Sequence, residues 1–492
     1  MSGLLVYEQF ESLGSTLGAS RTNFPFTSID QLFAGGDDEE QSNWGTPAQD
    51  ARKGLIGRFN YDYKGKYLAE FSFRYDGSLK FHPDRRWGFF PSVSLGWRLS
   101  EEAFMKKFSN LDNLKVRGSY GILGNDAVGG WQWLTNYSFG NAYIFNQAPI
   151  KSIVSGGIPN VDLTWEKTAT FNFGVDASIY KGLLAVEADV FYKRTYDILG
   201  SRNASMPQTF GATLPSENYG IVKVKGFELQ VKHDNKIGDF RYHVGGNVSW
   251  SRNKVIEKDY AAGAEPWNIP VGKTMGYRAC FVALGLFQSD EEAAAWPRFK
   301  GTQPTAGDVK YADLNNDGIM DERDKKVVSP YSNTPEIMFG LNLSASWKGF
   351  DFSALFQGAA NRNVMLSGFA TQMFINGASN LPKYLYEDHW TPDNRDARYP
   401  KAWGPDHPSN NKSSTFWLIN GNYVRLKNVE LGYSISKDLL SRVGVDRLRI
   451  YVGGSNLFSI DHMPGYDPEK QDGGPNYYPQ QRVFNMGVNI TF

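Results

Sequence analysis

The sequence predicts an all-β protein, specifically a transmembrane antiparallel β-barrel of which about 14 strands are present. Three observations support this fold. Apolar and polar residues alternate through most of the chain, and many alternating segments run about ten residues or more, against a usual five or six. The links between these segments are short and long in turn, which is typical of membrane barrels with tight turns on one side and long loops on the other.

The alternation is clearest in the last ten residues, VFNMGVNITF. Apolar side chains share one face of this segment, and small or polar ones share the other: Phe484, Met486, Val488, Ile490 and Phe492 against Asn485, Gly487, Asn489 and Thr491. A strand directs successive side chains to opposite faces. A strand with this pattern therefore places one face in an apolar medium and the other in a polar one.

The first four strands along the chain are predicted at 4–12, 54–63, 66–76 and 87–99. The third shows the period well, because its apolar side chains stand at alternate positions: Tyr67, Ala69, Phe71, Phe73 and Tyr75. Trp87 and Trp97 bracket the fourth strand, as expected for rings at the two boundaries of a membrane.

The middle of the chain adds five strands, at 112–123, 161–180, 182–199, 217–234 and 238–254. Their apolar faces alternate with charged or polar residues, as in Leu184, Val186, Ala188, Val190 and Tyr192. The last five strands are predicted at 335–348, 350–361, 421–434, 446–456 and 482–492. The first of these has its apolar face at Ile337, Phe339, Leu341, Leu343, Ala345 and Trp347.

The links fall into two classes. Tight turns are predicted at 64–66, 181–182, 235–238 and 348–349, and the three that contain Lys-Gly have a residue suited to a left-handed backbone. Long links occupy 77–86, 124–160, 200–216, 255–334, 362–420 and 457–481. We expect the long links to face outside the cell and the tight turns to face the periplasm.

A soluble β-sandwich also alternates, with its apolar face turned inward, and stays open as an alternative. Strand length and the bracketing aromatic residues favour the membrane. About ten residues at roughly 3.3 Å each, tilted by about 40°, span roughly 25 Å, which is the height of a barrel's apolar band.

Composition excludes several other classes. The 492 residues carry 52 basic and 52 acidic side chains, so nothing favours nucleic acid as a partner. One cysteine, Cys280, excludes an internal disulfide framework, and no apolar run approaches the roughly 18 residues of a spanning helix. No signal peptide is visible after Met1. Motifs such as GxSxG, a P-loop or HExxH are lacking, and we expect no enzymatic activity.

The sharpest local motif lies within GDVKYADLNNDGIMDERD, residues 307–324. Its oxygen donors have the spacing of a calcium-binding loop: Asp313, Asn315, Asp317, the Ile319 carbonyl, Asp321 and Asp324. Gly318 permits the sharp turn, whereas Asp324 stands where calcium loops usually have a bidentate glutamate. We expect a structural Ca²⁺ that stabilises the long extracellular link 255–334. The alternative is a solvated acidic turn.

Aromatic residues concentrate in the link 124–160, in the segment GGWQWLTNYSFGNAY. Trp131, Trp133 and Tyr137 are candidate substrate-binding residues, because flat rings stack on sugar rings and on peptide side chains. The alternative is that these rings pack the link against itself.

Longer stretches resemble the C-terminal part of SusC/RagA-like TonB-dependent outer-membrane transporters, in family order over about residues 1–492. The resemblance rests on NYDYKGKYLAEFSFRYDGSLKF (60–81), RRWGFFPSVSLGWRLSEEAFMK (85–106), LDNLKVRGSYGILGN (111–125), GDVKYADLNNDGIMDERDKKVV (307–328), NYVRLKNVELGYSISKDLL (422–440), LRIYVGGSNLFSIDHMPGYDPE (448–469) and the terminal NYYPQQRVFNMGVNITF.

The resemblance implies that residues 1–492 are part of a 22-stranded barrel whose plug domain is missing from this chain. It also implies an outer membrane location, a SusD-like surface lipoprotein as partner, and energy from TonB, ExbB and ExbD acting through the plug. Typical cargo is oligosaccharide or peptide. Contact with outer-membrane lipid is expected of any such barrel. A passive porin-like barrel and a soluble β-sandwich that binds glycans stay open as alternatives.

Overall fold

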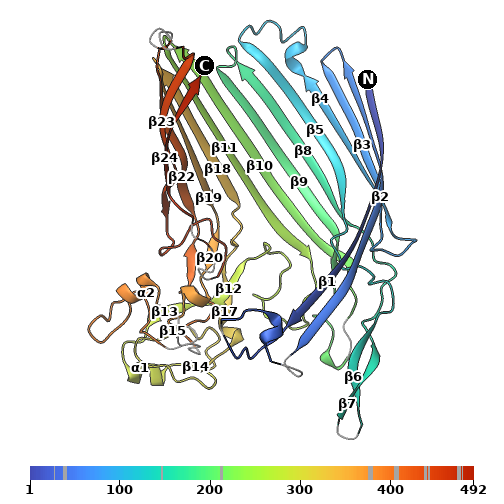
Figure 1. Ribbon diagram of the computed structural model, residues 1–492, viewed down its shortest axis with the longest axis vertical. Coiled ribbons are helices and arrows are strands. Elements are labelled where there is room, and N and C mark those ends of the chain that lie inside the picture. The colour runs from blue at the N-terminus through green and yellow to red at the C-terminus, as the bar shows by residue number, and fades with distance from the viewer. Residues whose placement is uncertain are drawn as a thin grey trace. The chain divides into compact units, whose positions relative to one another are not determined.

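The computed structural model describes all residues except 27, 37–40, 146–147, 211–213, 375–380, 404–408, 437–439, 441–443, 474–477 and 479. Its described residues form one antiparallel sheet of 14 long strands, which confirms the predicted fold class (Figure 1). In sheet order the strands are β1 (Ser2–Ser20), β2 (Ser42–Tyr63), β3 (Tyr67–Ser78), β4 (Trp87–Arg98), β5 (Leu111–Asn125), β8 (Glu166–Ile179), β9 (Leu184–Gly200), β10 (Glu217–Ile237), β11 (Phe240–Glu257), β18 (Ile337–Trp347), β19 (Phe350–Ala360), β22 (Tyr423–Ser434), β23 (Arg447–Asp461) and β24 (Val483–Thr491).

Strands β1 and β2 are much longer than predicted. They pair from Ser2 opposite Asn60 to Ser20 opposite Ser42, whereas β2 pairs with β3 only from Arg52 onward. The far half of this ribbon is therefore two-stranded and exposed on both faces. Because neither face is buried, its sequence needs no alternation of apolar residues, and periodicity gave no sign of it.

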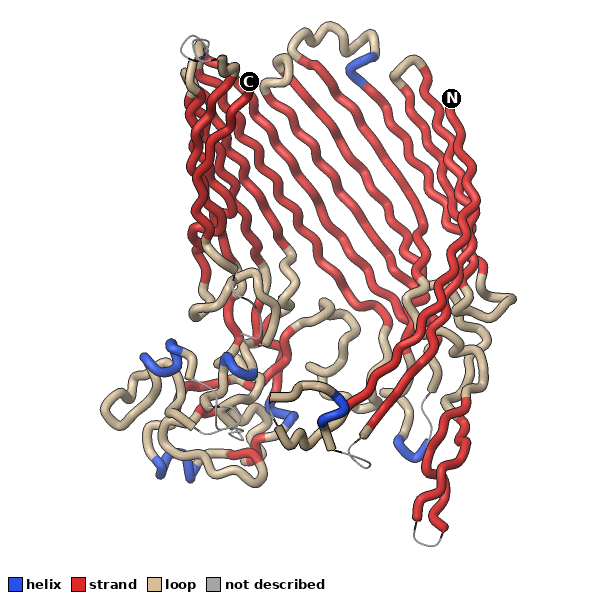
Figure 2. Tube along the Cα trace, in the orientation of Figure 1, coloured by secondary structure: helices blue, strands red, loops and turns tan. Residues whose placement is uncertain are grey.

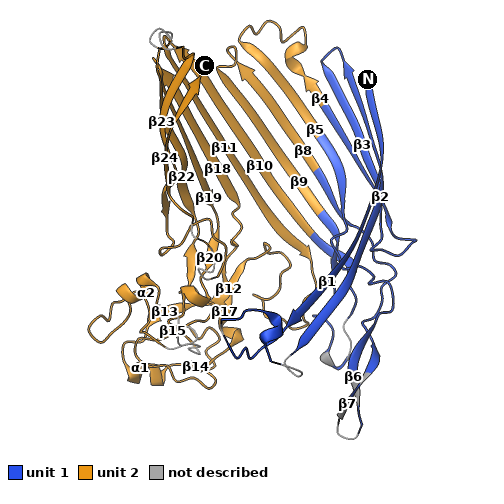
Figure 3. Ribbon diagram, in the orientation of Figure 1, with its two compact units in different colours: residues 1–95, 119–170, 195–221 blue, residues 96–118, 171–194, 222–492 orange. Residues whose placement is uncertain are grey.

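The chain divides into two compact units (Figure 3). Unit 1 comprises residues 1–95, 119–170 and 195–221. Its buried core contains Phe81, Phe90, Leu163 and Trp165, and the Trp165 ring lies 5.6 Å from the Phe81 ring and 5.2 Å from the Phe90 ring. The hairpin β6 (Tyr137–Phe145) and β7 (Ala148–Ser155) also belongs to unit 1.

Unit 2 comprises residues 96–118, 171–194 and 222–492. At one end of its long strands are tight turns, and at the other end the long links form short strands and helices (Figure 1). The link 255–334 contains β12 (Arg278–Phe281), β13 (Ala283–Leu286), α1 (Asp290–Ala295), β14 (Arg298–Phe299), β15 (Val309–Tyr311), β16 (Ile319–Met320) and β17 (Lys325–Ser329). The link 362–420 contains β20 (Asn363–Met365), α2 (Lys383–Glu387) and β21 (Leu418–Asn420).

These links are folded around cores of their own. Phe281, Val309, Tyr311 and Met320 form one core, and a second, larger core surrounds Trp417 and Met373. Burial raises the pKa of the Cys280 thiol to about 11, so this residue is an inert packing group. Strands of two to five residues are too short to show an alternating pattern. The sequence therefore predicted no strands within these links.

In the described residues, helical structure is confined to short segments outside the sheet (Figure 2). Single 3₁₀ turns cover Leu32–Ala34, Leu99–Glu101, Gln208–Phe210, Glu322–Asp324 and Gly368–Ala370. Among the described residues, none of the helices has the length and apolar character needed to cross a membrane.

The strand register in unit 2 separates a polar face from an apolar one. Asn247 of β11 stands opposite Gly340 of β18, which in turn stands opposite Gln357 of β19, so these residues share the polar face. One residue along, Val248, Phe339 and Gly358 share the apolar face. Large apolar side chains on that face are open to the surroundings, as in Phe484 at 77% and Met486 at 85% exposed.

Candidate functional site

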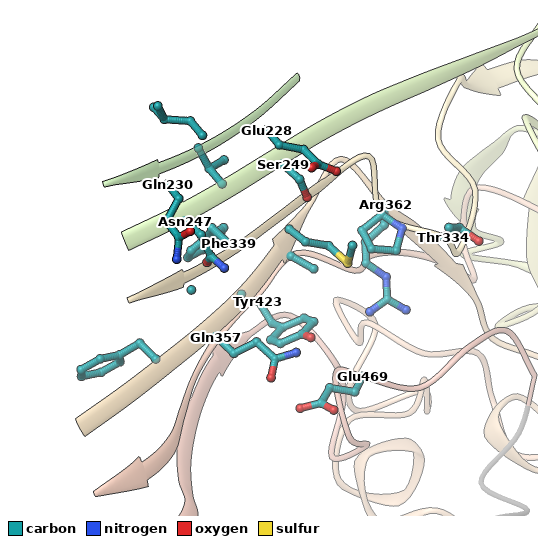
Figure 4. Close-up of a pocket in the computed structure, with 18 of the residues that line it drawn as sticks. Glu228, Gln230, Asn247, Ser249, Thr334, Phe339, Gln357, Arg362, Tyr423 and Glu469 are labelled. Carbon is teal, nitrogen blue, oxygen red and sulfur yellow. The ribbon is translucent and has the colours of Figure 1, made fainter. Parts of the chain in front are cut away.

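The candidate site is a pocket of about 720 Å³ on the polar face of unit 2 (Figure 4). Residues from β9, β10, β11, β18, β19 and β22 form its wall, and the links contribute its rim. Side chains that can donate or accept hydrogen bonds line it, among them Glu228, Gln230, Asn247, Ser249, Thr334 and Gln357. Arg362, Tyr423 and Glu469 line the same space.

Besides the carboxylates of Glu187, Asp189 and Glu228, the wall of the pocket carries uncharged amide side chains that can form hydrogen bonds. Within the part of the chain that the structure describes, the side chains of Gln230, Asn247 and Gln357 make no hydrogen bond or ion pair. A primary amide offers two donor hydrogens and an acceptor oxygen. The wall therefore presents donors and acceptors together, which suits a polar solute rich in hydroxyl or amide groups.

Arg362 fixes the rim of the pocket. Its side chain is buried, and it donates from Nε to the Asn333 carbonyl at 3.1 Å and from Nη1 to the Pro468 carbonyl at 2.6 Å. A further bond runs to the carbonyl of Lys470 at 2.5 Å. Burial lowers the pKa of this guanidinium. One side chain thus joins three link segments.

A second arginine holds the same rim from the sheet. Arg425 of β22 is 5% exposed and contacts Asp467 and Glu469, each at 2.8 Å. Lys427 also contacts Glu469, at 2.6 Å. We call residues 461–473 the strap. Asp472, near the far end of the strap, contacts Arg278 of β12 at 2.8 Å. The strap therefore ties the sheet to two long links.

The calcium-type loop, residues 313–324, follows β15 and contains β16 and the 3₁₀ turn at Glu322–Asp324. Its carboxylates accept bonds from backbone N–H groups: Asp313 from Asn316 and Gly318, Asp317 from Ile319, and Asp324 from Leu314 and Asp321. Asn315 accepts from the N–H of Asp317. These bonds hold the loop as a compact turn.

Arg323 supplies a positive charge inside this loop. Its guanidinium contacts Asp317 at 2.5 Å and Asp321 at 2.9 Å, and the bond from Arg323 lowers the pKa of Asp321. Among the described residues, no three acidic, histidine or cysteine side chains are grouped so that they could hold a metal ion. Calcium binding by this loop stays a prediction.

The aromatic candidates lie in unit 1. The Trp131 and Trp133 rings lie 6.2 Å apart, and His82 meets Trp133 edge-on at 5.3 Å. Tyr137 begins the β6–β7 hairpin and is 69% exposed. The structure thus brings the two tryptophans together and leaves Tyr137 on the surface. A role in substrate binding stays a prediction for all three.

Sequence reasoning missed the pocket residues and both arginines. Gln230, Asn247 and Gln357 are ordinary polar members of alternating strands, and nothing local distinguishes them from Asn485 or Asn489. Arg425 offered a weak signal, since a long cation within the segment NYVRLKN needs a partner if it is buried. Its partners lie more than forty residues away, in a link without periodicity.

An antiparallel sheet with long strands, an exposed apolar face and an opposite polar face defines an integral membrane protein of the β-barrel class. The chain belongs to the TonB dependent receptor-like, β-barrel family, whose model matches residues 6–457. It is accordingly an outer-membrane protein of a family of receptors rather than enzymes.

Curated relatives agree with this assignment. TonB-dependent receptor P26 of Formosa agariphila is 29% identical over 89% of this chain and 46% of its own length. TonB-dependent receptor SusC of Bacteroides thetaiotaomicron is 26% identical over 89% of this chain and 43% of its own length. The chain therefore spans about half the length of the curated relatives it matches.

Solved structures show the same fold. The RagAB peptide importer in its open-open state matches 100% of this chain and 52% of its own, with a TM-score of 0.78 and 23% identity. The closed-closed state of RagAB matches 100% of this chain and 53% of its own, with a TM-score of 0.77 and 24% identity. The predicted likeness to SusC and RagA is confirmed.

Proposed function

We propose that this chain is the barrel portion of a TonB-dependent importer that takes up oligosaccharides or peptides across the outer membrane. The observation that carries the proposal is the pocket wall of unpaired amide side chains, Gln230, Asn247 and Gln357. Sugars and peptide backbones both present alternating donors and acceptors, and such a wall replaces the hydrogen bonds that they lose with water. Family membership supports an energised transport cycle.

The same proposal includes a partner and an orientation. A SusD-like surface lipoprotein would deliver the solute, and TonB with ExbB and ExbD would supply energy through a plug. The long links, including 255–334, would face outside, and the tight turns would face the periplasm. In unit 2 the strap and the folded links stand at the end of the strands opposite the tight turns, which supports a mouth on that side.

Replacing Asn247 and Gln357 together by leucine in the complete protein is expected to lower uptake of its solute about tenfold or more. Each leucine keeps the approximate volume but removes the donors and the acceptor, so a bound polar group would be left unpaired. The measurement is the initial rate of uptake from labelled oligosaccharide and peptide mixtures, in cells with equal amounts of surface protein.

The matched control replaces Asn485 and Asn489 by leucine. These residues share the polar face but lie on β24, outside the pocket lining. Uptake that falls equally in both variants would contradict a role for the pocket. A third arm removes TonB: uptake that persists at the same rate would favour a passive pore over energised import.

We further propose that the loop 313–324 binds calcium and so stabilises the link 255–334. Added Ca²⁺ is expected to slow protease cleavage within this link severalfold, and a chelator to reverse the effect, because the ion would neutralise carboxylates that otherwise repel. Asp317 would exchange Arg323 for the ion.

The test compares Asp313→Ala plus Asp317→Ala with Glu291→Ala plus Glu265→Ala, which removes the same charge elsewhere in the link. Calcium protection is expected to vanish only in the first pair. Identical cleavage rates with calcium, with chelator and in both pairs would show that the loop is an acidic turn held by Arg323.

A further inference from the structure

Three tight turns repeat the same short sequence. An aromatic residue, a lysine and a glycine follow one another at Tyr63-Lys64-Gly65, Tyr180-Lys181-Gly182 and Trp347-Lys348-Gly349. They end the β2–β3, β8–β9 and β18–β19 hairpins. In the antiparallel strand order, hairpins at these positions all turn at the same end of the strands. The repeat therefore places one lysine at each of three turns of the same kind.

The backbone of these turns does not favour lysine. Lys64, Lys181 and Lys348 have φ angles of 54°, 58° and 46°, in the left-handed region. That conformation brings Cβ close to the following carbonyl oxygen, and turns of this kind usually use asparagine, aspartate or glycine. Three separate turns thus retain a residue that is conformationally unfavourable there. Turn stability alone does not explain the lysine.

The lysine side chains are exposed, and none forms an ion pair within the described residues. Lys64 lies over the Tyr63 ring, with Nζ 5.3 Å from its centre, and Lys348 lies 5.4 Å from the centre of the Trp347 ring. Each turn therefore carries a free ammonium, and in these two the ammonium stands beside an aromatic ring.

The rings themselves belong to the apolar face. Trp347 stands opposite Phe350 across its hairpin, and the Phe350 ring lies 4.6 Å from the Tyr433 ring. Tyr63 and Tyr67 stack at 6.4 Å in the first turn. All of these rings are between about two-fifths and one-half exposed. Aromatic rings at the end of an apolar strand face mark the depth of lipid head groups.

We propose that each Lys-Gly turn binds the phosphate of a phospholipid head group in the membrane leaflet on the tight-turn side. The ring lies among the upper acyl chains, and the flexible lysine stem carries its ammonium outward to the phosphate. The partner is a phospholipid surface rather than free phosphate, because the adjoining exposed rings need an apolar medium. Lipid binding at these turns is independent of the solute pocket.

The test uses the complete purified protein in neutral detergent. Dioleoylphosphatidylglycerol is titrated in, dioleoylglycerol without phosphate is titrated in parallel, and bound lipid is counted by native mass spectrometry. Replacing Lys64, Lys181 and Lys348 by glutamine is expected to lower phosphatidylglycerol affinity about fivefold at each turn, with no change for dioleoylglycerol. Arginine at the same positions should preserve binding, and inorganic phosphate should not displace the lipid.

The matched control replaces Lys258, Lys300 and Lys326 by glutamine, which removes the same charge from exposed positions in the link 255–334. A loss of phosphatidylglycerol as large as in the turn variant would overturn the proposal. So would unchanged binding in the turn variant.

Substitution by asparagine provides a second test, in which thermal stability and lipid binding are expected to change in opposite directions. Lys348→Asn is expected to raise the unfolding temperature in lipid-free detergent, because asparagine suits the left-handed turn, and to lower phosphatidylglycerol binding. Higher thermal stability together with undiminished lipid binding would mean that the lysine has no lipid role.

Discussion

Deleting residues 483–492 is expected to abolish accumulation of the assembled protein in the outer membrane. β24 pairs with β23 along its whole length, from Val483 opposite Ser455 to Thr491 opposite Arg447. Its loss would expose the N–H and C=O groups of β23 to hydrocarbon, where each unpaired group costs several kcal/mol. The measurement is the amount of heat-modifiable protein in the outer-membrane fraction, which should fall to background.

The control for this deletion keeps the strand and changes its polar face only. Asn485→Ser plus Asn489→Ser preserves every backbone pair and the apolar face of Phe484, Met486 and Val488. Assembly of this variant should match that of the unsubstituted protein. Normal amounts of heat-modifiable protein after the deletion would show that β24 is dispensable.

Replacing Arg425 by methionine is expected to release the strap. The substitution leaves Asp467 and Glu469 partly buried and without their main cation, and breaking a buried ion pair costs about 3–5 kcal/mol. Lys427 recovers part of this cost at Glu469. Amide hydrogen exchange in residues 461–473 should therefore accelerate by about 100-fold or more, as measured by mass spectrometry in detergent.

Arg482→Met is the matched control. Arg482 lies beside the same strap but is exposed, so its loss should leave exchange within about twofold, as is usual for surface charges. Arg425→Lys should be intermediate, because lysine keeps the charge but cannot reach both carboxylates with a planar fork. Unchanged exchange in Arg425→Met would show that packing around Met463 and Tyr466 suffices to hold the strap.

The strap and the pocket are expected to respond together. Glu469 and Gln471 of the strap line the pocket, and Arg362 holds the backbone of the strap at Pro468 and Lys470. Loosening the strap should therefore lower solute uptake even though the amide wall is intact. The uptake assay for Asn247 and Gln357 applied to Arg425→Met would measure this coupling directly.

Strand position was predictable from the sequence because a strand's period is local. Phe484, Met486, Val488 and Ile490 define an apolar face without reference to any other part of the chain, and the structure places β24 where they predict it. The far halves of β1 and β2 were not predictable, because backbone pairs alone hold them and no buried face imposes a pattern.

The sequence by itself thus determined the fold class, the long strands and the two faces of the sheet. It also determined the position of the acidic loop, because Asp313 and Gly318 form their turn within a few residues. Only the tertiary structure decided which polar residues face a common pocket and which partners Arg362 and Arg425 find. Those contacts depend on strand register and on links that meet across long stretches of chain. The physical reason is that alternation and turn formation are local and repetitive, whereas a pocket is made by side chains that only the completed sheet brings together.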